Sequence, residues 1–169
     1  MKGFDLAGPI HTYLANDHNR LDESLHRAGA GQNRIDSEAY AEFRAGLLRH
    51  ISIEEKILIP AAQRLRGGTP LPIVAKIRLD HGALVALMVP PPTVSLISTL
   101  RSILTVHNKL EEEVEGLYEA SEHAIGADAG VLLELIRKAA DVRILPHNPD
   151  PKALEAARRA VERAGYAMD

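Results

Sequence analysis

The stretch FRAGLLRHISIEEKILIPAAQRL, residues 43–65, decides the predicted fold. Its apolar residues recur every three or four positions, which is the spacing of one face of an α-helix. Two ionisable residues, His50 and Glu54, fall on the same apolar stripe. Glycines at positions 67 and 68 are typical of a helix end. The stretch therefore predicts an amphipathic helix whose buried face carries an imidazole and a carboxylate.

The same helical period continues on both sides of this stretch, and the sequence shows no sustained alternation typical of strands. Short turns rich in Gly and Pro separate the periodic segments. Four long helices joined in this way predict an all-α fold, an up-down-up-down four-helix bundle. The predicted helices run from about Pro9 to Ala28, from Ser37 to Leu65, from Ile73 to Met88 and from Thr93 to Glu122.

The rest of the chain is predicted to be helical as well. We assign residues 1–125 to the bundle and residues 126–169 to a C-terminal helical extension that is packed on the bundle or appended to it. The extension has one short helix predicted from Val131 to Arg143 and an amphipathic one from Lys152 to Ala164. Its sequence fits both a cap on the bundle and a contact surface for a protein partner.

Composition narrows the function classes. The chain of 169 residues is 46% hydrophobic and 25% charged, and its net charge is -3. This charge gives no overall attraction for phosphate backbones, and no apolar run approaches the roughly 20 residues that span a bilayer. We expect no nucleic-acid partner and no membrane association. The first 14 residues do not resemble a secretory signal, so a cytoplasmic protein is expected.

The content of metal-binding residue types is unusual. Cysteine is absent, which excludes disulfides, thiolate zinc sites and iron–sulfur clusters. The chain has eight histidines, and four of them fall on the apolar stripes of the four predicted helices. Burial of such groups is costly unless they satisfy one another or bind a metal ion. This combination favours a metal site or acid–base chemistry.

Two sequence patterns repeat along the chain. The pattern D-H-x-x-L occurs at Asp17–Leu21 and again at Asp80–Leu84. The pattern H-x-x-x-E-E occurs at His50–Glu55 and again at His107–Glu112. Because the patterns alternate from helix to helix, they indicate a repeated helix pair in which each half offers two histidines and one stripe-facing glutamate.

The spacing of the second pattern suits metal binding. Residues i and i+4 share a helix face with their Cβ atoms about 5–6 Å apart, so each H-x-x-x-E presents an imidazole and a carboxylate to one volume. Four imidazoles and two carboxylates suit two first-row transition ions, two histidines to each ion and both carboxylates bridging. The candidate ligands are His18, His50, Glu54, His81, His107 and Glu111.

On these two patterns, the chain resembles a hemerythrin-like (HHE cation-binding) domain from about residue 9 to residue 123. The resemblance implies a four-helix bundle that encloses a non-haem di-iron centre, with manganese or zinc as substitutes for iron. It also implies a small diatomic or peroxide ligand. The implied roles are His18 and His50 on one iron, His81 and His107 on the other, and Glu54 and Glu111 as bridges.

Some neighbouring residues depart from the family pattern or are read as structural. Oxygen carriers of the family have a further histidine where this chain has Ile77, which argues against reversible oxygen carriage. Glu55 and Glu112 are turned about 100° from the ligand face and are predicted to be salt-bridged surface acids. Tyr13 and Tyr118 are predicted to be packing residues, with hydrogen bonding to the site as the alternative.

Three functions remain open on the sequence. The first is a di-iron domain that binds or senses dioxygen, peroxide, nitric oxide or iron itself. The second is an enzyme whose centre reduces peroxide or dioxygen. The sequence does not decide whether such turnover occurs. The third is a structural interaction bundle that holds zinc or no metal.

Overall fold

The computed structural model describes residues 7–168, and within this range every regular element is a helix and none is a strand, as the sequence predicts. Helices α2 and α3 are continuous through a π-helical turn, η1. The elements are α1 (Pro9–Ala28), α2 (Ser37–Ile53), η1 (Glu54–Leu58), α3 (Ile59–Leu65), α4 (Val74–Leu87), α5 (Val94–Glu112), α6 (Leu117–Ile125), the 3-10 turn η2 (Gly126–Asp128), α7 (Ala129–Arg137) and α8 (Pro151–Arg163).

Local sequence signals begin and end the helices. The side chain of Asp36 accepts hydrogen bonds from the first backbone N–H groups of α2, and Thr93 does the same for α5. Such caps satisfy donors that have no partner inside the helix. Gly67 follows α3 with a φ of 69°, a backbone conformation that glycine adopts at little cost. These three helix ends therefore lie close to where the sequence predicts them.

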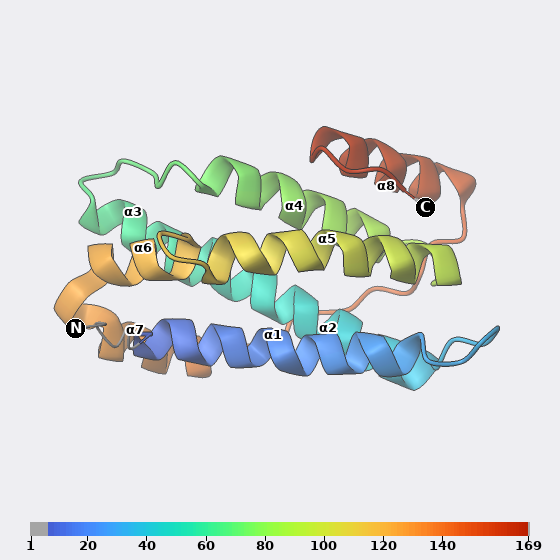
Figure 1. Cartoon of the computed structure of the whole chain (residues 1–169), viewed down its shortest axis with the longest axis horizontal. Coiled ribbons are helices and arrows are strands. Elements are labelled where there is room, and N and C mark those ends of the chain that lie inside the picture. The colour runs from blue at the N-terminus through green and yellow to red at the C-terminus, as the bar shows by residue number, and fades with distance from the viewer. Residues whose placement is uncertain (1–6, 169) are drawn as a thin grey trace.

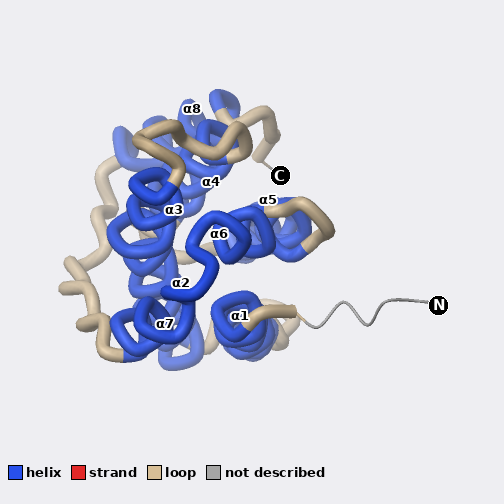
Figure 2. Tube along the Cα trace, turned by 90° about the vertical axis from the view of Figure 1, so that its left-hand side faces the viewer, coloured by secondary structure: helices blue, strands red, loops and turns tan. Residues whose placement is uncertain are grey.

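The long helices run side by side and alternate in direction along the chain (Figure 1). Figure 2 looks along them and shows α1, α2, α4 and α5 around a common axis. Helix α1 packs against α2 and α5, and α4 packs against α5. This arrangement turns one side of each helix toward a shared interior.

The prediction of one continuous helix from Thr93 to Glu122 is wrong. Helix α5 ends at Glu112, and the chain turns through Glu113–Gly116 before α6 begins. Glu115 has a φ of 62°, which no helix interior contains. At Gly116 an added Cβ would lie 2.7 Å from the carbonyl oxygen of Leu110, so only glycine fits this approach of α6 to the end of α5.

The interior consists of two apolar clusters with a polar layer between them. On α1, Leu14 belongs to one cluster and Leu21 to the other, and His18 lies between them. On α4, Ile77 and Leu84 flank the layer in the same way. The apolar packing on both sides fixes the position of the polar layer along the helix axes.

The C-terminal extension packs on the other helices. Helix α7 contacts α1 and η1, and α8 contacts α4. Ile136 of α7 and Val161 of α8 are fully buried in the two apolar clusters. Helix α7 ends at Arg137, six residues earlier than predicted, and residues 138–150 form an irregular connection to α8.

Candidate metal centre

The six side chains predicted as ligands meet in the polar layer. All six are buried, and they form two groups of four whose nitrogen and oxygen atoms lie within 4.8 Å of one another. The first group is His18, His50, Glu54 and Glu111, and the second is Glu54, His81, His107 and Glu111. Each group could hold one metal ion.

The two glutamates belong to both groups, and each directs one oxygen atom to each group. Glu54 places Oε1 3.1 Å from His50 Nε2 and Oε2 3.1 Å from His81 Nε2. Glu111 places Oε2 3.1 Å from His18 Nε2 and Oε1 3.0 Å from His107 Nε2. This is the arrangement that two carboxylates need in order to bridge a pair of ions.

A π-helical turn begins at the first bridging candidate. The backbone N–H of Ile59 donates to the carbonyl of Glu54, five residues earlier, and Pro60 follows directly. Proline has no N–H, and its ring clashes with the carbonyl four residues before it, so a regular helix would be distorted at this point. A widened turn accommodates this proline, and such turns are frequent at functional sites.

Each of the four imidazoles also contacts a carboxylate on the side away from the centre. The two aspartates of the D-H pairs bond to the helix that follows each of them in the chain. Asp17 Oδ2 lies 2.8 Å from His50 Nδ1, and Asp80 Oδ2 lies 3.2 Å from His107 Nδ1. These bonds join α1 to α2 and α4 to α5.

The second glutamate of each E-E pair completes the pattern. Glu55 Oε1 lies 2.7 Å from His81 Nδ1, and Glu112 Oε1 contacts His18 Nδ1. Glu55 also pairs with Arg78 at the surface. The prediction of salt-bridged surface acids is correct for the pair of Glu55 with Arg78, but it missed the bonds to His81 and His18, because these histidines belong to other helices. The repetition of the whole words D-H and E-E was the signal that could have revealed them.

These outer bonds fix the chemistry of the rings. A carboxylate at Nδ1 keeps a proton there and leaves Nε2 as the atom that faces the centre. Metal-ligating histidines in proteins almost always have such a partner, which orients the ring and raises its basicity. The four carboxylates therefore support a metal-binding role for the four histidines.

Tyr118 of α6 lies at the centre, although the sequence favours a packing role for it. It is fully buried, and its hydroxyl donates a hydrogen bond to Glu54 Oε1 at 2.7 Å. The prediction that it serves only packing is wrong, and the alternative of hydrogen bonding to the site is correct. The break between α5 and α6 brings it there.

Three of the donor atoms in the second group lie 3.0–3.1 Å from an oppositely charged neighbour but form no hydrogen bond of suitable geometry. They are Glu54 Oε2, His81 Nε2 and Glu111 Oε1, and all three are buried. Buried polar atoms without partners are rare in native proteins, and each costs free energy. A metal ion in the second group would satisfy the three atoms together, so the residues present fit such an ion.

Carboxylates around the centre stabilise the protonated form of the imidazoles in the metal-free protein. Burial lowers the pKa of His50, but the charge of Glu54 and the hydrogen bond to Asp17 outweigh it and raise the pKa to about 10. Burial also lowers the pKa of His81 and His107, but the neighbouring carboxylates outweigh it and raise the pKa to about 11 for His81 and to about 9 for His107. The histidines thus supply the positive charge that a metal ion would supply in their place.

The carboxylates respond in the opposite direction. Burial and the proximity of Glu111 raise the pKa of Glu54, but His50 and His81 outweigh them and lower it to about 2. Burial and the two carboxylates raise the pKa of Tyr118 well above its usual value. Two ionised carboxylates therefore lie at the middle of the centre, an environment that could hold a cation.

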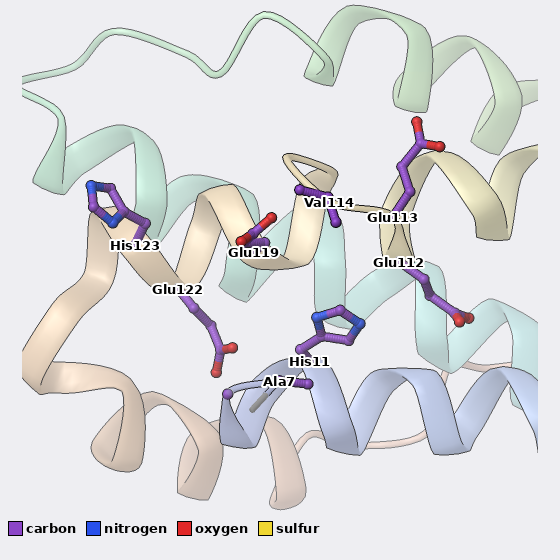
Figure 3. Close-up of a pocket in the computed structure, with 9 residues that line it drawn as sticks. Ala7, His11, Glu112, Glu113, Val114, Glu119, Glu122 and His123 are labelled. Carbon is purple, nitrogen blue, oxygen red and sulfur yellow. The ribbon is translucent and has the colours of Figure 1, made fainter. Parts of the chain in front are cut away.

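A cavity of about 440 Å³ lies beside the centre, at the break between α5 and α6. Figure 3 shows His11 of α1 directed toward the α5–α6 connection, and Glu112 directed toward α1. The ring of His11 lies 5.6 Å from that of Tyr118. The cavity therefore approaches the first group from outside, because Glu112 lines the cavity and contacts His18 Nδ1.

Several other residues lie away from the donor atoms of the centre. Ile77 is fully buried in an apolar cluster and offers no donor atom. Asp22, His26 and His123 are exposed. The ring of His147 lies 5.9 Å from that of Tyr40, within the connection to α8.

Comparison of the chain with protein-family models, with curated proteins and with solved structures gave no match. Among residues 7–168, no helix combines the length and the apolar character that crossing a membrane requires. The fold and the site therefore define an all-helical protein with buried histidine and glutamate groups suited to metal ions.

Proposed function

We propose that the protein is a hemerythrin-like four-helix bundle that binds two iron ions and, at that pair, a small diatomic or peroxide ligand. One observation carries the proposal: Glu54 directs one oxygen to His50 and the other to His81, and Glu111 directs one oxygen to His18 and the other to His107. A single ion would not need carboxylates placed in this way.

The separations of the donor atoms in the first group favour a six-coordinate ion such as iron over tetrahedral zinc. Structural zinc prefers four-coordinate tetrahedral sites. At metal–ligand distances of about 2.1 Å, adjacent donors are about 3.0 Å apart around an octahedral ion and about 3.4 Å apart around a tetrahedral one. His18 Nε2 and His50 Nε2 are 3.0 Å apart, and each lies 3.1 Å from a bridging carboxylate oxygen. These values fit a six-coordinate ion in the first group. In the second group His81 Nε2 lies 3.7 Å from Glu111 Oε1, and imidazole is a ligand for iron and for zinc.

The chain's own residues would prepare the site for a small ligand. The outer carboxylates hold the imidazoles with Nε2 inward, and the two apolar clusters exclude bulk water above and below the centre. Four protein donors on a six-coordinate ion leave positions that a small ligand can take. Iron, when bound, supplies the redox change that binding or sensing of dioxygen, peroxide or nitric oxide requires.

Metal analysis tests the proposal. We expect protein loaded with ferrous iron without oxygen to hold two irons per chain and to develop ferric absorption in the near ultraviolet and visible after exposure to air. His50→Ala should lose most of the iron, whereas the exposed control His26→Ala should retain it. A colourless protein with one zinc ion or no metal, or equal iron loss in both variants, contradicts the proposal.

A further inference from the structure

The hydroxyl oxygen of Tyr118 is close to every donor atom of the first group. It lies 2.9 Å from His18 Nε2 and 3.2 Å from His50 Nε2. It lies 2.7 Å from Glu54 Oε1 and 3.1 Å from Glu111 Oε2. An ordinary hydrogen-bonding hydroxyl has one proton to donate and two lone pairs, so four close neighbours exceed what hydrogen bonding requires.

These distances match one corner of an octahedron. An octahedral ion with bonds of about 2.1 Å keeps adjacent ligands about 3.0 Å apart. The four separations from the Tyr118 oxygen lie between 2.7 and 3.2 Å. The separations of His18 Nε2 from His50 Nε2, of His18 Nε2 from Glu111 Oε2 and of His50 Nε2 from Glu54 Oε1 lie between 3.0 and 3.1 Å. The hydroxyl thus stands where the apex of a square pyramid stands above its four basal ligands.

We propose that Tyr118 is a fifth protein ligand of the ion held by His18 and His50, so that the two ions of the pair differ in protein coordination. This inference rests on the proposed metal-binding function. On metal uptake the phenolic O–H bond breaks, the oxygen forms a bond to the ion, and the proton passes to the buffer. No electron is transferred in this step.

The second group has no counterpart of this tyrosine. Tyr118 lies seven residues after Glu111, and the residue seven after Glu54 is Ala61. Ile77 is apolar and adds no donor. An octahedral ion in the second group would therefore keep two positions free of protein ligands, against one in the first. An external ligand such as azide then binds at the ion of His81 and His107.

Spectroscopy of the ferric protein tests the proposal. A phenolate bound to ferric iron gives a charge-transfer band in the visible, and resonance Raman excitation in that band enhances tyrosine ring modes. We expect both in the wild type and in the control variant Tyr13→Phe. In Tyr118→Phe both should be absent, although iron still binds to the protein. Tyr13 is half-buried on α1 and contacts none of the donor atoms described above.

A second measurement does not depend on the folding of a variant. Wild-type protein made with ring-deuterated tyrosine should show the enhanced Raman modes shifted to lower frequency. If wild-type protein binds two irons but does not show these modes, the tyrosine assignment is overturned, whereas the proposed metal centre is not contradicted. A Tyr118→Phe variant that retains the tyrosine modes also overturns the tyrosine assignment. A Tyr118→Phe variant that binds iron more tightly than the wild type overturns it as well, because the hydroxyl then only fills the site. A chain that takes up no metal overturns the proposed function itself.

Discussion

Asp17 Oδ2 and His50 Nδ1 lie 2.8 Å apart and connect helix α1 to helix α2 at the edge of the centre. Asp17 directly precedes His18, so one D-H pair serves both imidazoles of the first group. Asp80 stands in the same relation to His81 and His107. The two halves of the molecule therefore repeat the histidines and also the acids that orient them.

Replacement of the outer acid tests this relationship. Asp17→Asn should lower the affinity for metal about 10- to 100-fold, because the amide no longer holds the His50 ring in its basic, Nε2-inward form. Competition with a chromophoric chelator measures the affinity. The matched control is Asp22→Asn, an exposed acid one turn further along α1. Equal affinities in the wild type and Asp17→Asn would show that the bond does not support the site.

Replacement of a bridge tests the sharing of ligands. Glu54→Gln keeps the size of the side chain but removes the charge that faces both groups, so the iron content should fall from two ions per chain to one or fewer. The exposed Glu113→Gln is the control and should keep two. Iron determination after gel filtration measures this ratio. Two tightly held irons in Glu54→Gln would mean that Glu54 is not a shared ligand.

The pKa values predict how the metal-free protein responds to alkali. The folded chain holds protons on His50, His81 and His107 up to about pH 9 to 11, whereas the usual value is 6.5. Above pH 6.5 the folded state therefore binds more protons than the unfolded state, and the free energy of unfolding falls as pH rises. Urea titrations of chelated protein at pH 6 and pH 9 should show the lower midpoint at pH 9. A midpoint that rises would contradict this reading.

Acid acts on the carboxylates. Because the pKa of Glu54 is lowered from 4.5 to about 2, its stabilising contribution is present above pH 4.5 and is lost as pH falls toward 2. The metal-free protein should therefore be most stable between about pH 4.5 and 6.5.

The affinity for metal should rise with pH above 6.5, whereas the stability of the metal-free protein falls. The ions bind neutral imidazoles and displace their protons.

Removal of the metal should lower the melting temperature. An ion present at a hundred times its dissociation constant stabilises the folded state by about 2.7 kcal/mol. For a chain of this size, that corresponds to roughly 5–10 °C per site. Calorimetry at pH 7 with and without chelator measures the shift. An unchanged melting temperature after proven removal of the metal would show that the ions do not contribute to stability.

The sequence predicted the parts of the molecule that follow from periodicity. Apolar spacing located the helices, and the placement of His18, His50, His81 and His107 on their stripes brought four imidazoles to one layer. Glu54 and Glu111 followed because a residue four positions after a histidine lies on the same helix face. These features depend only on positions within single helices.

The parts that depend on helix breaks or on neighbouring helices were not predictable in this way. In a continuous helix Tyr118 would lie seven residues, or about 10 Å, beyond Glu111 and out of reach of the site. The break at Glu113–Gly116 removes that separation. The bond between Glu55 and His81 was not predicted because His81 lies on another helix.

Anomalous diffraction from crystals of the iron-loaded protein, measured at the iron absorption edge, locates the bound ions directly. We expect two peaks about 3.5–4 Å apart. Both should lie between Glu54 and Glu111, one beside His18 and His50 and the other beside His81 and His107. A single peak, or peaks outside the layer formed by these six side chains, would contradict the proposed pair of ions.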